Sequence, residues 1–165
     1  MDIYVFDKSF NLQGIIDRFT SLIWKREYYK SGTFELHVFL PKSNKDASDL
    51  IALLSKGNIL MKEDSPEEAG YIENITLDDQ GSESIVVSGY FIDNFLKERI
   101  VWGMQSQSGT IEDVMKNYVS NNCISPTNVN RVIPSLVLSS PRGITKLAND
   151  VNSYSDLAEW MEELA

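Results

Sequence analysis

Few residues of this sequence have the side chains and spacing that nucleophilic catalysis needs. His37 is the only histidine and Cys123 the only cysteine. A serine or cysteine nucleophile normally needs a base beside it, whereas the position of His37 in the middle of an expected strand predicts a polar residue on a half-exposed face. The chain has no G-x-S-x-G, G-x-G-x-x-G, Walker A or H-E-x-x-H motif. We therefore predict that the protein is not an enzyme, and we assign no catalytic residue.

Acidic side chains and the single cysteine are the remaining candidates for holding a metal ion. One cysteine excludes both an intrachain disulfide and a Cys-rich zinc site. The segment 78–83 reads DDQGSE and looks like a calcium loop, but it lacks the alternating oxygen ligands and the distal glutamate of such a loop. We interpret it as a solvated hairpin turn, and we expect neither a metal nor a cofactor.

Four aromatic residues are the strongest candidates for a binding role. Trp24, Tyr28 and Tyr29 lie on an expected long hairpin, and Trp102 follows an expected short helix. One interpretation of each is packing in or beside the core. A second is a protein–protein contact, because Trp and Tyr are enriched at interface hot spots, and a third is a sugar-stacking platform. These four residues form our candidate interaction surface.

Charge and composition narrow the function classes further. The 165 residues carry a net charge of −9, with 15 Lys+Arg against 24 Asp+Glu. We expect neither nucleic acid nor anionic lipid as the main partner, because both need clustered Lys and Arg. Residues 1–60 carry 8 basic and 7 acidic side chains, whereas residues 61–165 carry 7 and 17. No Lys or Arg interrupts residues 63–83, which we interpret as a solvated rim, a face for a basic partner, or a cation site.

Targeting signals are not recognisable in the sequence. The N-terminus has neither the basic start nor the apolar run of a signal peptide. The longest apolar stretches fall far short of the ~20 residues that cross a bilayer. We expect a protein that is made in the cytosol and has no membrane anchor.

Period-2 alternation of apolar residues predicts β-structure over most of residues 1–100. The expected strands cover residues 3–6, 11–16, 20–30, 33–40, 59–62, 70–77 and 84–90. Ser31-Gly32 is expected to form a tight turn with positive φ at the glycine, and Asp79-Gln80-Gly81 a second turn. A short helix is expected at 46–55, with Ser48 as its N-cap. Six or seven short strands joined by such turns predict an antiparallel β-barrel-like domain, closed or half-closed.

Residues 101–165 are predicted to form a smaller helical and mixed connecting segment, so that the fold class is α+β. A short helix at 91–99 is expected to pack on the sheet. A clearer helix begins after Thr110, whose side chain is expected to cap the helix together with Asp113. A polar loop at 121–131 and a further strand at 131–138 are expected to follow.

The last expected helix, at 155–165, has an apolar stripe but no end signal. The stripe consists of Leu157, Trp160, Met161 and Leu164. No glycine, asparagine or basic last turn closes the helix, and a helix this short needs a surface to pack on. Two interpretations remain: a fragment of a longer protein, or a naturally frayed C-terminus.

Short motifs follow one another along the chain in a distinctive order. They are Trp24-x-Arg26, SGTFEL at 31–36, GNI at 57–59, GYIENI at 70–75, IVVSG at 85–89, FLKERI at 95–100 and YSDLAEW at 154–160. Their order and spacing resemble the N-terminal part of siphophage tail-hub proteins, the ReqiPepy-type minor tail family that is related to baseplate hubs and tail-associated proteins.

The resemblance implies a structural, non-enzymatic role at the tip of a phage or prophage tail. Hub proteins of this class form a ring, usually a homotrimer, that binds the distal tail protein and leads on to tail fibres or receptor-binding parts, with the tape-measure protein as a further partner. Each subunit contributes two related barrels. This chain would supply the first barrel, at 1–100, and the connecting segment at 101–165, but not the second barrel.

The same resemblance implies a location in the virion tail tip, and in the host cytoplasm during assembly. It implies no cofactor, no nucleic-acid specificity and no membrane anchoring. Any lytic activity of such proteins resides in C-terminal extensions that this sequence lacks.

Two functions of other classes stay open as alternatives. One is a carbohydrate-binding, adhesin-like β-domain that uses Trp24 or Trp102. The other is a carboxylate-dependent cell-wall hydrolase, because a catalytic carboxylate pair cannot be recognised among 24 acidic residues.

Overall fold

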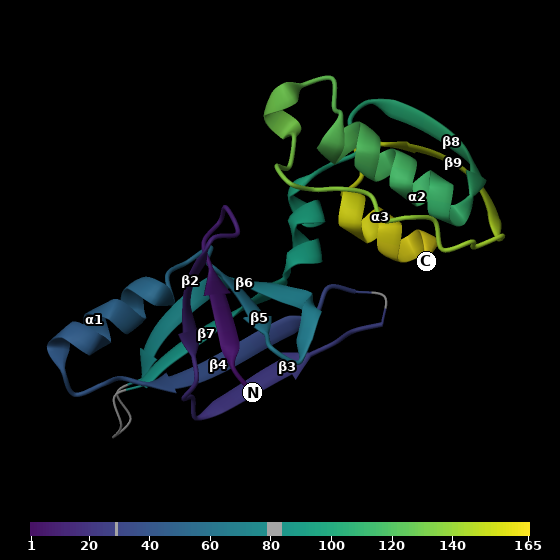
Figure 1. The fold of residues 1–165 in the computed structure, drawn as a ribbon. Helices are drawn as coiled ribbons and strands as arrows, with labels where there is room; N and C mark the ends of the chain where they lie inside the picture. The colour runs from purple at the N-terminus through teal and green to yellow at the C-terminus, as the bar shows by residue number, and fades with distance from the viewer. Residues whose placement is uncertain (29, 79–83) are drawn as a thin grey trace. The chain divides into compact units, whose positions relative to one another are not determined.

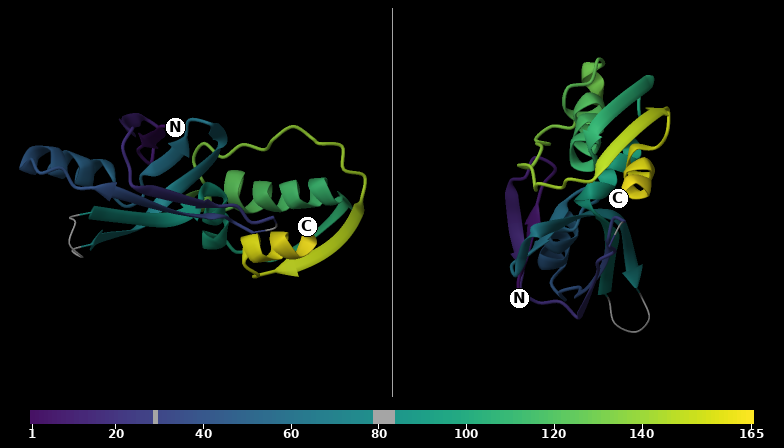
Figure 2. Two further views of the ribbon diagram at one scale, coloured as in Figure 1. Left: turned by 90° about the horizontal axis from the view of Figure 1, so that it is seen from below. Right: turned by 90° about the vertical axis from the view of Figure 1, so that its right-hand side faces the viewer.

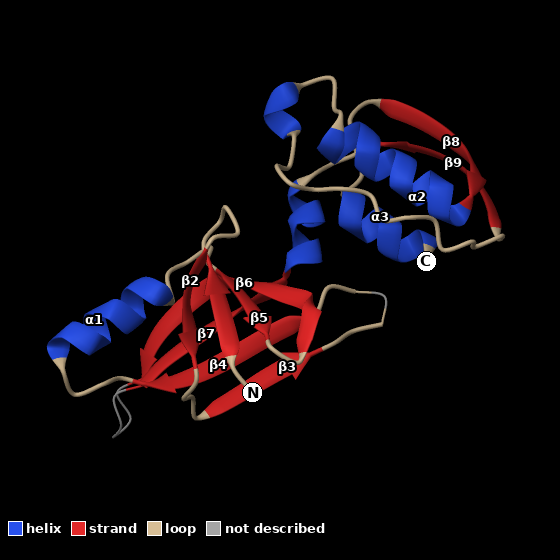
Figure 3. Ribbon diagram, in the orientation of Figure 1, coloured by secondary structure: helices blue, strands red, loops and turns tan. Residues whose placement is uncertain are grey.

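The computed structural model describes residues 1–28, 30–78 and 84–165 (Figure 1). The chain divides into two compact units, residues 1–93 and 94–165. The first is built mainly of strands and the second of helices with a two-stranded sheet, so the predicted α+β class is confirmed (Figure 3). None of the helices in the described part of the chain combines the length and the apolar character needed to cross a membrane.

The first unit is a seven-stranded antiparallel sheet with the order β2-β1-β5-β6-β7-β4-β3. Its strands are β1 (Ile3–Phe6), β2 (Leu12–Ile16), β3 (Ser21–Lys25), β4 (Thr33–Phe39), β5 (Ile59–Lys62), β6 (Ser65–Asp78) and β7 (Ser84–Phe91). Each predicted strand of this unit therefore exists, because period-2 alternation is a reliable signal where one face of a sheet is buried.

The predicted barrel-like closure is wrong, because the sheet is open. Strands β2 and β3 stand at its two ends, and each pairs with a single neighbour. Both end strands have only five residues, whereas closure requires the first and last strands to pair along a consistent tilt. The sheet thus keeps two edges with unpaired backbone groups.

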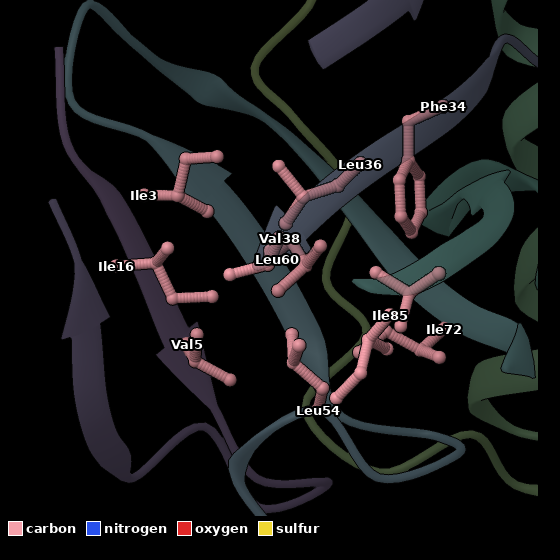
Figure 4. Packing of buried hydrophobic residues seen from close by; sticks show 11 residues of the cluster. Ile3, Val5, Ile16, Phe34, Leu36, Val38, Leu54, Leu60, Ile72 and Ile85 are labelled. Carbon is pink, nitrogen blue, oxygen red and sulfur yellow. The ribbon is translucent and has the colours of Figure 1, made fainter. Parts of the chain in front are cut away.

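The core of the first unit lies on one face of this sheet (Figure 4). On β4 the alternate residues Phe34, Leu36 and Val38 are all buried, as predicted. They cluster with buried side chains from five other strands, among them Ile3, Ile16, Leu60, Ile72 and Ile85. Burial of this apolar surface, at roughly 25 cal/mol per Å², is the main stabilising contribution to the sheet.

Helix α1 (Asn44–Leu53) lies at one end of the sheet (Figures 1 and 2). Leu54, directly after the helix, is fully buried in the core cluster, and Leu50 and Leu53 pack against that cluster. The predicted cap at Ser48 is wrong: the side chain of Ser43 accepts from the amide of Asp46. The helix therefore starts a turn earlier than predicted.

The hairpin of β3 and β4 differs from the prediction at its turn. Lys25 pairs with Thr33, so the connection spans residues 26–32 and is not a tight turn at Ser31-Gly32. Gly32 does not have positive φ; among the described residues, the glycines that do are Gly57, Gly103, Gly109 and Gly143. A Cβ atom on Gly32 would lie 2.5 Å from the carbonyl oxygen of Lys25 and 2.6 Å from the Phe91 ring. Glycine is required here by close approach rather than by backbone conformation.

In the second unit one helix packs on a two-stranded sheet, and a second helix packs on the first (Figure 2). A 3₁₀ helix (Ile92–Glu98) leads into it, and its elements are β8 (Met104–Thr110), α2 (Ile111–Val119), a π-helical turn (Ser120–Ile124), a 3₁₀ turn (Val129–Arg131), β9 (Leu147–Ser153) and α3 (Leu157–Leu164). The predicted cap at Thr110 is confirmed, since its side chain accepts from the amide of Asp113.

The predicted stripe of the last helix is also confirmed. Leu157 and Trp160 are buried, and Met161 and Leu164 pack against the same cluster. The Trp160 ring lies 4.1 Å from the Tyr118 ring of α2, centroid to centroid. Helix α3 thus has the packing surface that so short a helix needs.

The strand predicted at 131–138 is wrong, and the sequence did not predict strands β8 and β9 of this unit. Ile133 makes one backbone hydrogen bond to Cys123, and the amide of Leu136 bonds back to Ile133 in a turn. Both side chains pack against the core cluster. The segment is thus irregular, and Pro134 has no N–H to give to a ladder.

Candidate functional site

Three of the four aromatic residues singled out from the sequence are described, and they are divided between the two units. Trp24 and Tyr28 belong to the first unit and Trp102 to the second, while Tyr29 lies outside the described residues. The exposed fractions differ as well: Tyr28 is 90% exposed and Trp102 59%, whereas Trp24 is only half-buried. Each therefore has to be judged by its own surroundings.

Trp24 is anchored on the sheet. The centroid of its ring lies 5.5 Å from that of the Phe34 ring and 4.9 Å from that of the Phe91 ring. Its indole N–H donates to Oε2 of Glu68 at 2.9 Å, and Nζ of Lys62 lies 5.6 Å from its ring centroid. A tryptophan with both its ring and its N–H engaged fits the packing interpretation better than the interface one.

Two glycines leave room for this aromatic group. A Cβ atom on Gly70 would lie 2.6 Å from the Phe34 ring, and one on Gly89 would lie 3.0 Å from it and 1.9 Å from the carbonyl oxygen of Tyr71. The Phe34 ring therefore covers the positions where β6 and β7 have no side chains. The two glycines of the GYIENI and IVVSG motifs have a packing role.

Three carboxylates of the acidic stretch form ion pairs within the first unit. Oε1 of Glu68 lies 2.6 Å from Nε of Arg26, Glu73 lies 3.0 Å from Lys56, and Asp64 lies 3.4 Å from Lys62. Among the described residues no group of three or more His, Cys, Asp or Glu side chains could hold a metal ion. Most of the calcium-like segment, residues 79–83, lies outside the described part.

Hydrogen bonds and burial within the fold account for the titratable groups whose pKa is shifted. Hydrogen bonds from Lys116 and from the amide of Arg142 lower the pKa of Glu112. Burial raises the pKa of the Cys123 thiol and, with the carboxylate of Asp150, that of Tyr118. A general acid of a glycosidase needs a carboxyl with raised pKa, whereas in the described part of the chain the two carboxyls with a shifted pKa, those of Glu112 and Asp7, have it lowered.

His37 has a local partner on its own strand. Its Nε2 lies 2.7 Å from Oε1 of Glu35, two residues away on β4. Both side chains lie on the face opposite the buried Leu36. This arrangement agrees with the predicted polar residue on a half-exposed face.

Trp102 stands beside a pocket in the second unit. The pocket has a volume of about 280 Å³ and is lined by Trp102, Asn121, Ser125, Thr127, Asn128 and Arg131, with Gln105 and Pro126 completing its wall. The guanidinium carbon of Arg131 lies over the Trp102 ring, 5.1 Å from its centroid. The sequence singled out Trp102 but not its partners, most of which lie about 20 to 30 positions further along the chain.

Comparisons with known proteins found similarity to phage and prophage proteins. A family model described as "Siphovirus ReqiPepy6 Gp37-like protein" matches residues 2–165. The fold is similar to that of prophage tail protein gp18 from Listeria monocytogenes EGD-e, with a TM-score of 0.65 and 16% identity, over 99% of this chain and 45% of that protein. This chain thus spans less than half the length of gp18. No curated protein matches the chain.

Proposed function

The chain belongs to the Siphovirus ReqiPepy6 Gp37-like family, and we propose that it is a structural protein of a phage or prophage tail. The observation that carries the proposal is the family match over residues 2–165. It is supported by the fold, which nearly the whole chain shares with a prophage tail protein. The sequence motifs quoted above come from both units of the structure, so the resemblance is not confined to one of them.

Within the tail, we place the protein in the baseplate hub ring. The open sheet supports this, because β2 and β3 both present unpaired backbone groups. Exposed apolar side chains accompany these edges: Leu12 and Ile15 on β2 and Ile23 on β3 are each about half exposed. In a cyclic assembly such edges meet different surfaces of neighbouring subunits, which would cover them.

The ring would be a trimer of the full-length protein, with the distal tail protein as its first partner and the tape-measure protein and tail fibre as further ones. The distribution of charge between the two units indicates what kind of surface a partner would present. Residues 1–93 carry 9 basic and 16 acidic side chains, against 6 and 8 in residues 94–165. The excess acid therefore belongs to the sheet unit, which favours a basic partner surface there.

We propose no enzymatic activity for this chain. The hydrolase alternative finds no support in the carboxyl groups with shifted pKa, which are held in their ionised form. The carbohydrate-binding alternative is favoured by one specific observation, the polar pocket beside Trp102, as an additional property and not as a replacement for the tail role.

The experiment that tests the tail role is reconstitution with the distal tail protein encoded in the same genome. The full-length protein and that partner, each purified separately, are mixed and analysed by size-exclusion chromatography with light scattering. We expect a trimer that co-elutes with the distal tail protein. A full-length protein that stays monomeric with and without the partner would contradict the ring, and failure to co-elute would contradict the assigned partner.

A further inference from the structure

The pocket beside Trp102 has the composition of a site for a ligand covered in hydroxyl groups. Its lining is dominated by amide and hydroxyl side chains, with one aromatic wall and no aliphatic Leu, Ile, Val or Met among the described residues that line it. Pockets for drug-like ligands and hot-spot pockets for protein side chains are mostly apolar. We propose that this pocket binds a saccharide through a single pyranose ring.

Trp102, the aromatic wall of the pocket, lies beside a second exposed ring, that of Tyr154. Trp102 is 59% and Tyr154 63% exposed, and their rings meet edge to face with centroids 6.0 Å apart. The face of an aromatic ring is electron-rich, and the C–H bonds on one side of a pyranose carry the complementary partial charge. An exposed indole therefore attracts a sugar ring, while the sugar hydroxyls remain available at its rim.

The rim of the pocket offers partners for those hydroxyls. Within the described part of the chain, no hydrogen bond engages the side chains of Asn121, Ser125 or Thr127, and all three are exposed. An amide or a hydroxyl can both donate and accept, and sugar hydroxyls need both. These three side chains are therefore available for a ligand without breaking any internal bond.

The aromatic wall is held in place before any ligand arrives. The fully buried amide of Asn122 accepts from the backbone N–H of Trp102 at 2.8 Å and from Nε2 of Gln105 at 3.1 Å, and it donates to the carbonyl of Tyr118 at 2.8 Å. The guanidinium of Arg131, which lies over the indole, also donates to the carbonyl of Ile100. A preorganised site loses less conformational entropy on binding.

The size and charge of the pocket limit the class of sugar that it can bind. A volume of about 280 Å³ falls just below the roughly 300–1,000 Å³ of drug-sized pockets, so the pocket suits one ring with further sugar units outside. Arg131 is the only charged side chain among the described residues of its lining, which favours a neutral or acidic sugar over a basic one. We expect a weak site, with a Kd of about 1 mM.

The test uses the 165-residue chain, labelled with ¹⁵N and titrated with glucose, galactose, rhamnose, N-acetylglucosamine and glucuronic acid. We expect at least one sugar to give saturable shifts of the Trp102 indole signal and of the backbone amides at 125–131. Saturable shifts for none of the five sugars, or shifts confined to residues outside the pocket, would overturn the proposal. The outcome does not depend on the tail role, because no assembly is needed for a sugar to bind.

Variants assign the binding to individual side chains. We expect Trp102→Ala to weaken binding at least about tenfold, and Asn121→Ala and Thr127→Ala about two- to fivefold each. The latter two change exposed loop side chains, so they keep the test decisive if Trp102→Ala fails to fold. Tyr28→Ala, which removes an aromatic ring that is 90% exposed in the other unit, is the control and is expected to bind as the parent does. Unchanged affinity in all three pocket variants would refute the site.

Discussion

The indole N–H of Trp24 donates a 2.9 Å hydrogen bond to Oε2 of Glu68, a residue 44 positions further along the chain. The bond joins the edge strand β3 to β6, which are not neighbours in the sheet. It therefore crosses the face of the sheet, above Phe34 and Phe91. This relationship favours the packing interpretation of Trp24, whose contribution to stability can be measured.

We expect Trp24→Ala to lower the free energy of unfolding by about 3 kcal/mol, because it removes the stacked ring and leaves a gap over Phe34. Urea denaturation followed by circular dichroism measures the change. Ile23→Ala, at the neighbouring and 56% exposed position on the same strand, is the control and is expected to stay within about 0.5 kcal/mol of the parent. Equal stabilities for the two variants would favour the interface interpretation of Trp24.

Two variants of Glu68 distinguish the contribution of its hydrogen bond to stability from that of its ion pair. Glu68→Gln keeps an acceptor for the Trp24 N–H but loses the charge that faces Arg26 at 2.6 Å. Arg26 is largely exposed, so we expect this variant to cost under about 1 kcal/mol. Glu68→Ala removes both the hydrogen-bond acceptor and the charge. We expect it to cost about 1–2 kcal/mol more than Glu68→Gln, since the half-buried N–H of Trp24 loses its acceptor. If Gln and Ala at this position are equally stable, the hydrogen bond contributes nothing measurable.

Glycines of this chain distinguish crowding from backbone strain. A Cβ atom on Gly89 would lie 1.9 Å from a backbone oxygen, whereas Gly143 has φ of +77° and nothing within 4 Å. We expect Gly89→Ala to cost about 3 kcal/mol or more, and Gly143→Ala about 1 kcal/mol from its left-handed conformation alone. Thermal unfolding of both variants checks the order. The reverse order would mean that β6 and β7 do not approach as closely as described.

A related expectation concerns Gly32. Gly32→Val is expected to cost more than about 1 kcal/mol, through contact with the Lys25 carbonyl and the Phe91 ring and not through its φ. Gly32→Ala is the informative second variant, because even one methyl group meets both atoms. A melting temperature unchanged in both variants would place the Lys25 carbonyl and the Phe91 ring further from Gly32 than the structure has them.

The elements that could be predicted are those with one buried face. Phe34, Leu36 and Val38 alternate in the sequence and are all buried, and Leu157 and Trp160 follow the helical period. Strands β8 and β9 were missed because their sequences, MQSQSGT and LANDVNS, show no apolar alternation. Their inward positions carry polar residues such as Asn152, which is buried. Pairing with each other and packing on α2 stabilise them, and neither is visible locally.

Closure of the sheet and assembly of the pocket could not be predicted for a common reason. Both depend on residues that are distant in sequence: closure on whether β2 meets β3, and the pocket on where the loop after α2 returns. The π-helical turn at Ser120–Ile124 ends α2, and the loop that follows it supplies most of the pocket wall around Trp102. A pattern that is read along the chain predicts elements, but it does not predict which of their ends meet.

The last prediction concerns stability at alkaline pH. The hydroxyl of Tyr118 donates to Oδ2 of Asp150 at 2.8 Å, and burial together with this carboxylate raises the pKa of Tyr118 above its usual value of 10. In the unfolded chain the same tyrosine loses its proton near pH 10, so the folded state binds the proton more tightly. Stability is therefore fully present below pH 10 and is lost as the pH rises beyond it.

Urea denaturation at pH 8 and at pH 11 measures this loss for the parent, for Tyr118→Phe and for Asp150→Asn. We expect Tyr118→Phe to be less stable at pH 8, by about 1–3 kcal/mol, because Asp150 loses its donor. The gap to the parent should narrow at pH 11, since phenylalanine has no proton to lose. Asp150→Asn removes the charge but not the burial, so its alkaline loss should be intermediate. A gap of the same size at both pH values would show that Tyr118 does not link proton binding to folding.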